Sequence, residues 1–139
     1  MSRKIKVTMT EEQAKLLSQA AELYARLMTG QLEVLAECLP GTSPLAHFIN
    51  TGKINAMDEA VKDLKHVVTG FSMYHSYGIH NPVVPEKARV LYDLHQVLRH
   101  QVQKNKPSPW KGMQVWDDPP MQVSEKTPLA TIEEIPDPD

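Results

Sequence analysis

The chain of 139 residues has a single cysteine, Cys38, and no long uninterrupted apolar run. One cysteine can neither form an internal disulfide nor build a thiolate zinc site. No segment approaches the roughly 18 uncharged apolar residues that a membrane span requires, and no apolar run of signal-peptide length follows the first residues. We therefore expect a cytoplasmic protein with no membrane partner and no sulfur-based chemistry.

The motifs of common enzyme classes are also missing. The sequence has no Walker-type phosphate loop, no Gly-x-Gly-x-x-Gly and no Gly-x-Ser-x-Gly elbow. Its six histidines include the pairs His75 with His80 and His95 with His100. Helical ligands of one metal ion are spaced three or four residues apart, whereas His95 and His100 point about 140° apart on a helix. We predict no catalytic residue, no metal site and no cofactor.

Charge is distributed unevenly along the chain. Residues 117–139 hold seven acidic residues and one lysine, whereas residues 1–116 hold 14 basic and ten acidic residues. The mildly basic body fits an anionic ligand, although the acidic tail could simply cover a basic face of its own or of a neighbouring subunit. No run rich in lysine and arginine is interleaved with aromatics, so we expect no DNA or RNA partner.

Short strands are predicted near both ends of the chain. Residues 4–9 alternate apolar and polar side chains, which is the period of a half-buried strand, and we assign residues 1–9 to it. Residues 110–135 are rich in proline and form a predicted β tail, with 113–116 and 129–135 as its structured segments. The last residues, from Pro136 onward, are expected to be frayed.

Three helices are predicted between these strands. Thr10 and Gln13 form a capping box, and the apolar spacing that follows continues to Pro40, which gives a long helix over 10–39. Gly30 inside it indicates close packing or a kink, or alternatively the end of one helix before another begins. Further amphipathic patterns predict helices over 56–69, closed by Gly70, and over 86–105.

The predicted fold is a single α+β domain over residues 1–139 that is mostly helical, with a loop over 70–85. A first helix of about 28 residues would be about 42 Å long, which exceeds the usual helix in a domain of this size. Such a helix generally buries its excess length against another copy of the chain. We therefore expect a homo-oligomer.

The loop 70–85 combines aromatic rings with hydrogen-bonding side chains. Phe71, Tyr74 and Tyr77 can stack on a flat base. Asn81 can donate and accept hydrogen bonds, and Arg99 can bind a phosphate through two parallel hydrogen bonds. These are the groups that a nucleotide needs. The alternative is that the rings belong to the core or to an interface, that Asn81 starts a turn, and that Arg99 is a surface charge.

Several segments together resemble a known family. They are Thr-Glu-Glu-Gln-Ala at 10–14 with Gly-Gln-Leu-Glu at 30–33, Tyr-Gly-Ile-His-Asn-Pro at 77–82, the helix over 88–100, and Trp-Asp-Asp-Pro at 116–119 with Pro-Leu at 128–129. On these motifs the chain is similar to the first-described Thoeris anti-defence sponge family, a group of small phage-encoded proteins. The resemblance covers nearly the whole chain.

The resemblance implies a non-enzymatic viral protein that sequesters glycocyclic ADP-ribose, an immune signal made by host TIR-domain enzymes. It also implies homo-oligomers, with cyclic di- or trinucleotides as further ligands of some members at a separate site. By position, Phe71 corresponds to the base-stacking aromatic, Asn81 to a polar ligand contact and Arg99 to a phosphate contact. His100 and Asp117 would complete the site across a subunit interface.

Two other functions are consistent with the residues. A phage accessory protein could inhibit a host protein by direct contact, with the acidic tail as its arm. A metal-dependent phosphodiesterase could instead destroy the signal. We expect the sponge, with Tyr77 among its ligand contacts.

Overall fold

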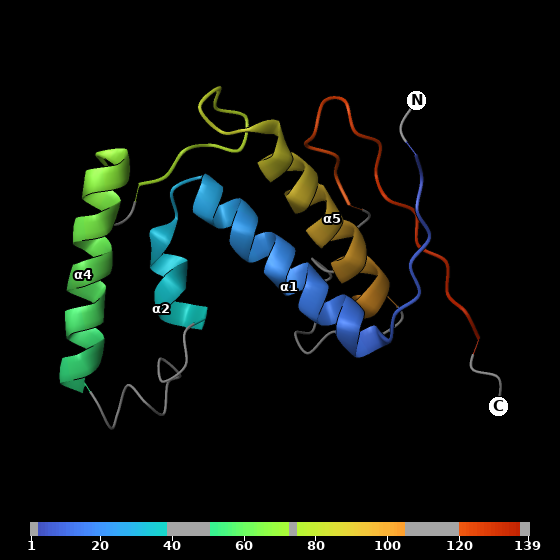
Figure 1. Cartoon of the computed structure of the whole chain (residues 1–139), viewed down its shortest axis with the longest axis horizontal. Helices are drawn as coiled ribbons and strands as arrows, with labels where there is room; N and C mark the ends of the chain where they lie inside the picture. Colours follow the sequence, from blue (N-terminus) through green and yellow to red (C-terminus); the bar gives the residue numbers. More distant parts are fainter. Residues whose placement is uncertain (1–2, 39–50, 73–74, 105–119, 137–139) are drawn as a thin grey trace, which may run out of the picture. The chain divides into compact units, whose positions relative to one another are not determined.

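The computed structural model describes residues 3–38, 51–72, 75–104 and 120–136. Its elements are α1 (Glu11–Met28), the 3-10 helix η1 (Leu32–Val34), α2 (Leu35–Cys38), α4 (Thr51–Thr69) and α5 (Glu86–Gln103) (Figure 1). The chain divides into two compact units, one made of residues 1–22 and 90–139 and the other of residues 23–89. The segment 113–116 and the site residue Asp117 lie outside the described residues.

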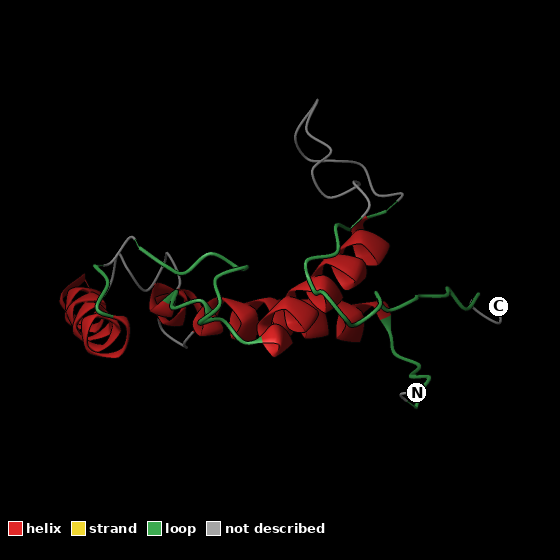
Figure 2. Ribbon diagram, turned by 90° about the horizontal axis from the view of Figure 1, so that it is seen from above, coloured by secondary structure: helices red, strands yellow, loops and turns green. Residues whose placement is uncertain are grey.

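The predicted α+β class is wrong, because the described residues are helices and loops without a β-strand; Figure 2 shows the same. No backbone–backbone hydrogen bond joins residues 3–9 to residues 120–136. Ile5, Val7 and Ile135, which a half-buried strand would cover, are largely exposed. Alternating side chains produce a strand only when a neighbouring strand supplies the ladder and a surface covers the apolar face. Neither segment has such a neighbour in the described part of the chain.

The helix predicted over 10–39 is also interrupted, since α1 ends at Met28. The amide of Gly30 donates to Leu27 O at 3.0 Å and that of Gln31 to Arg26 O at 3.0 Å, which is the hydrogen-bond pattern of a Schellman C-cap. Gly30 has a φ of +84°, a left-handed conformation that glycine adopts without strain. The alternative of two successive helices is therefore correct, and the inference of a homo-oligomer from one long helix loses its basis.

The predicted capping box at the start of α1 is confirmed. The Thr10 amide donates to Gln13 Oε1 at 2.9 Å, and the Gln13 amide donates to Thr10 Oγ1 at 3.1 Å. Glu11 and Glu12 occupy the first turn, where negative charge is favourable to the helix dipole. All of these contacts join residues within one turn, so the local sequence is sufficient to specify them.

In the unit that holds the chain ends, side chains of α5 bind the backbone of the C-terminal segment. The buried carboxylate of Asp93 accepts hydrogen bonds from the amides of Val123 at 2.8 Å and Ser124 at 3.1 Å. The carboxamide of Gln96 pairs with both backbone groups of Met121, at 3.1 and 3.3 Å. Side chains of α5 therefore form the hydrogen bonds that these backbone groups would otherwise form with a neighbouring strand.

In the other unit, α4 packs against η1 and α2. Lys65 on α4 is fully buried, and its ammonium donates to both carboxylate oxygens of Glu33, at 2.8 and 3.1 Å. A buried charge requires such a partner. Gly70, with a φ of +76°, ends α4, and its amide donates to His66 O at 2.8 Å. Nothing in the helices of the described ranges meets the length and apolarity of a membrane span.

Candidate functional site

The predicted site residues are divided between the two units. Phe71, Tyr77 and Asn81 belong to the unit of residues 23–89, whereas Arg99 and His100 lie on α5 in the part that belongs to the other unit. Asp117 is outside the described residues. The geometry below therefore concerns the first three, and the ligand roles of Arg99, His100 and Asp117 stay predictions.

The segment after α4 returns over the C-terminus of α1. The Tyr77 amide donates to Thr29 O at 2.8 Å, which places the Tyr77 ring beside Gly30. A β-carbon added to Gly30 would lie 3.2 Å from Thr69 Cγ2 and 3.6 Å from the Tyr77 ring. The close packing predicted at Gly30 is thus confirmed, and its cause is the approach of this segment.

Three rings gather on the segment that follows Gly70. The Phe71 and Tyr77 rings meet edge to face, with centroids 4.7 Å apart and an interplanar angle of 64°. The His75 ring stacks on Phe71, with ring centroids 6.4 Å apart and an interplanar angle of 29°. The backbone is fixed as well, because the Phe71 amide donates to Thr69 Oγ1 at 3.0 Å. Aromatic contacts of this kind hold a ring in one orientation.

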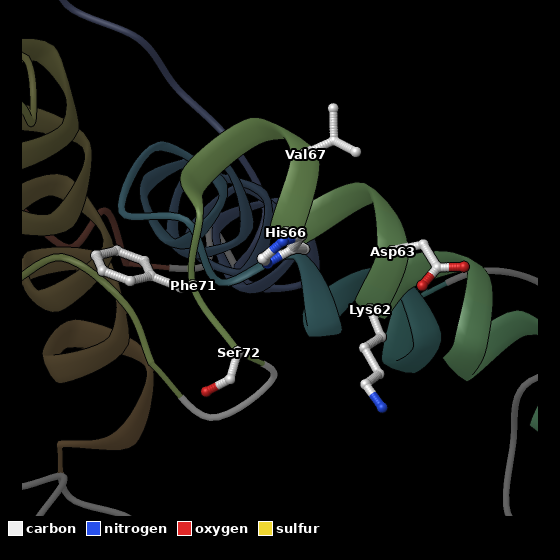
Figure 3. Close-up of a pocket in the computed structure, with 6 residues that line it drawn as sticks. All are labelled: Lys62, Asp63, His66, Val67, Phe71 and Ser72. Atoms are coloured by element: carbon white, nitrogen blue, oxygen red, sulfur yellow. The ribbon is translucent and has the colours of Figure 1, made fainter.

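Phe71 forms one wall of a hollow of about 400 Å³ at the C-terminal end of α4 (Figure 3). Its other lining residues are Lys62, Asp63, His66, Val67 and Ser72. The volume falls within the range of roughly 300–1,000 Å³ that is usual for small-molecule sites. The hollow thus combines an aromatic wall with a lysine, a histidine, an aspartate and a hydroxyl, and that hydroxyl lies 2.6 Å from His75 Nδ1.

Asn81 forms a turn, as the alternative interpretation proposed. Its Oδ1 accepts from the Val83 amide at 2.9 Å, its own amide donates to Gly78 O at 2.9 Å, and its carbonyl accepts from the Val84 amide at 2.9 Å. The carboxamide oxygen is therefore already used by the backbone, in the manner of an Asx turn. A ligand contact from Asn81 would have to come from its Nδ2 group.

Arg89 is a structural residue of this loop that the sequence did not reveal. Its guanidinium donates to Glu86 Oε2 at 2.6 Å, to Ile79 O at 2.9 Å and to Val84 O at 3.3 Å. It therefore connects the first turn of α5 with both ends of the 79–84 turn. The only local signal was its position three residues after Glu86, which is an ordinary helical ion pair.

A serine, a histidine and a glutamate come together in the unit that holds the chain ends. Ser18 Oγ lies 2.9 Å from His95 Nδ1, and His95 Nε2 lies 3.3 Å from Glu22 Oε2. However, the Ser18 hydroxyl donates to His95 O at 2.9 Å, and Nδ1 lies 3.0 Å from Ser18 O. Both Ser18 and His95 are buried. The group resembles a catalytic triad in composition, but its hydrogen bonds join α1 to α5.

His95 and Ser18 are separated by 77 residues in the sequence, so no motif spacing pointed to them. One further turn along α5, His100 has a buried Nδ1 with no hydrogen-bond partner in the described part of the chain. No three histidine, cysteine, aspartate or glutamate side chains among the described residues are placed to hold a metal ion.

No protein-family model matches the chain, and neither a curated protein nor a solved structure matches it. The resemblance to the sponge family therefore stays a prediction.

Proposed function

We propose that this protein binds a small cyclic nucleotide and sequesters it without turnover, and that the ligand is glycocyclic ADP-ribose made by host TIR-domain enzymes. The observation that carries the proposal is the hollow beside Phe71. An aromatic ring that is half-buried and held by two neighbouring rings offers a fixed surface to a planar base. Stacking of a base on an aromatic side chain is worth about 1–3 kcal/mol.

Sequestration requires a preorganised site more than a reactive group. A sponge must bind a scarce signal tightly, and ordering a loop on binding would reduce the affinity. The segment around the hollow is already fixed by the Tyr77–Thr29 hydrogen bond, the Phe71–Thr69 hydrogen bond and the Arg89 contacts. These contacts support preorganised positions for Phe71, Tyr77 and the 79–84 turn.

The proposal also includes a location and an oligomeric state. We propose that the protein acts in the cytoplasm of the infected bacterium, where the signal is made, and that it forms a homo-oligomer. Cyclic di- or trinucleotides are further candidate ligands. His100 and Asp117 are the residues that another copy would contribute. Arg99 would bind the phosphate groups, and Asn81 would bind through its Nδ2 group.

Calorimetry followed by recovery of the ligand tests the proposal. The full chain is titrated with glycocyclic ADP-ribose, denatured by heat, and the released ligand is analysed by mass spectrometry. We expect tight binding and unchanged ligand. Phe71→Ala should weaken binding about tenfold or more, because a stacking contact is lost. Ile5→Ala, which removes an exposed apolar side chain of the N-terminal segment, is the control and should bind normally.

A linear or hydrolysed product would show that the protein is an enzyme, and absence of binding would remove the sponge function altogether. If Phe71→Ala bound with wild-type affinity, the ligand site would lie elsewhere on the chain.

A second candidate, inhibition of a host protein by direct contact, has one observation in its favour. On α4, Leu64, Val67 and Val68 are 46, 81 and 65 % exposed. A cluster of exposed aliphatic residues on one helix is typical of a protein-binding surface. Val68→Glu separates the two functions: it should abolish anti-defence activity in cells only if this face binds a protein, and should leave ligand binding intact in either case.

A further inference from the structure

We infer that two copies of this chain associate through α1, and that an exposed apolar stripe on this helix packs antiparallel against the same stripe of the second copy. The exposed stripe is made of Leu16, Leu17, Ala20, Leu23, Tyr24 and Leu27. The inference rests on the proposed function only for its homo-oligomer. It adds the surface through which the copies associate and the direction in which the helices pair.

Helix α1 carries apolar residues on two sides. On one side Ala21 and Ala25 are buried. On the other side lies the exposed stripe, in which Leu16, Leu17 and Tyr24 are 54, 40 and 48 % exposed. A helix that is apolar on all sides is normally buried on all sides. Because the described part of the chain leaves these three side chains accessible, α1 has a face to offer to a partner.

The spacing within the exposed stripe is typical of a helix that pairs with another helix. Its residues recur at intervals of three and four from position 16 to position 27, which covers about three turns. Ala20 lies in the middle of the stripe, and so small a side chain lets a second helix approach closely. Single exposed apolar residues are common on protein surfaces, whereas a continuous stripe indicates an interaction site.

Charges along one edge of the exposed stripe favour a second copy as the partner. Glu12, Gln19 and Arg26 are spaced seven residues apart, so they share this edge. When two copies pair antiparallel, the edge meets itself in reverse order. Glu12 then lies opposite Arg26 of the partner subunit, and this ion pair occurs twice. The two Gln19 side chains meet at the centre.

The same edge argues against parallel pairing. In a parallel pair, Glu12 and Gln19 would lie beside the apolar edge of the second copy, which holds Leu17 and Tyr24. No opposite charges would then meet. Antiparallel pairing also brings each helix N-terminus near a helix C-terminus, which is the favourable arrangement of the two helix dipoles.

Charge reversal with compensation tests the inference on the full chain by analytical ultracentrifugation. Glu12→Arg and Arg26→Glu should each raise the dissociation constant of the dimer about tenfold, because like charges then meet twice. The double variant Glu12→Arg/Arg26→Glu should associate as the wild type does, because opposite charges meet again. Leu16→Glu should abolish association at the same concentrations. Lys87→Glu, at an exposed lysine of α5, is the matched control and should associate normally.

Cross-linking with a short bifunctional maleimide tests the direction of pairing. In a Cys38→Ser background, Gln19→Cys should give covalent dimers, because the two positions face each other in an antiparallel pair. Glu12→Cys should not cross-link to itself, but should cross-link when it is mixed with Arg26→Cys. Equal cross-linking of Gln19→Cys and of Glu12→Cys alone would overturn the antiparallel arrangement.

The outcomes separate this inference from the function it rests on. A monomeric wild type, or a double variant as weak as the single ones, would overturn the interface. Binding of glycocyclic ADP-ribose is measured separately by calorimetry. Tight binding by a monomer would remove the interface and leave the sponge function, whereas a dimer that binds no ligand would do the opposite.

Discussion

Gly30 shows how one residue determines the path of two segments. It ends α1 in a left-handed conformation, and it leaves space in which Thr69 and Tyr77 approach the backbone. The sequence identified this glycine as unusual, because a glycine inside an apolar helical pattern costs about 1 kcal/mol relative to alanine. It could not decide between a kink and a helix end, since that depends on the distant residues that pack there.

Alanine substitutions at three glycines should separate backbone strain from crowding. Gly70→Ala should destabilise the fold by about 1–2 kcal/mol, because a left-handed conformation is strained for alanine and nothing lies within 4 Å of the added carbon. Gly30→Ala should cost more, because its β-carbon also meets Thr69 Cγ2 at 3.2 Å. Gly78→Ala, with open space and no positive φ, is the control.

Urea unfolding of the three variants measures these differences. Equal stability of the Gly30→Ala and Gly70→Ala proteins would mean that the Thr69 side chain does not crowd position 30 in solution.

At the scale of elements, the sequence predicted the helix caps correctly, but it could not predict contacts between residues far apart in the chain. The capping box and the Gly70 cap join residues at most four positions apart, and both could be predicted. The Glu33–Lys65 ion pair and the Asp93–Ser124 hydrogen bond join residues about 30 positions apart, and no spacing rule applies to them. The prediction of strands was wrong for the same reason, because a strand depends on a partner strand that its own sequence does not specify.

The attachment of the C-terminal segment to α5 gives a prediction for this scale. Asp93→Ala removes the acceptor of the Val123 and Ser124 amides, so these amides should exchange with solvent faster than in the wild type. Hydrogen exchange followed by mass spectrometry measures the change. Asp93→Asn keeps one carbonyl acceptor and should be intermediate. Unchanged protection of residues 120–127 in Asp93→Ala would show that other contacts hold this segment.

At the scale of the whole molecule, the candidate site was only partly predictable. The ring at Phe71 lines a hollow, which the density of aromatic residues in the loop suggested. The oxygen of Asn81 is engaged in a turn, and a sequence cannot show whether a polar group is already bonded. Lys62 and His66, which also line the hollow, could not be identified from the sequence, because they lie on a helix whose exposed side carries many polar residues.

Self-association is a prediction for the whole molecule. Its basis is now the large apolar residues left exposed on α1, namely Leu16, Leu17 and Tyr24. Exposed apolar surface on this scale favours burial against another chain. Light scattering of the purified protein should give a mass that is a multiple of the monomer mass at micromolar concentration. A monomeric mass would mean that one chain forms the ligand site alone.

The burial of Lys65 has a practical consequence for chemical footprinting. An amine-reactive reagent should modify the exposed Lys62 of the folded protein and leave Lys65, three residues further on, unmodified. A single proteolytic peptide can then contain both Lys62, which reports on the site, and Lys65, which serves as the internal reference. Protection of Lys62 by a bound nucleotide would be measured against a neighbour that reacts only when the chain unfolds.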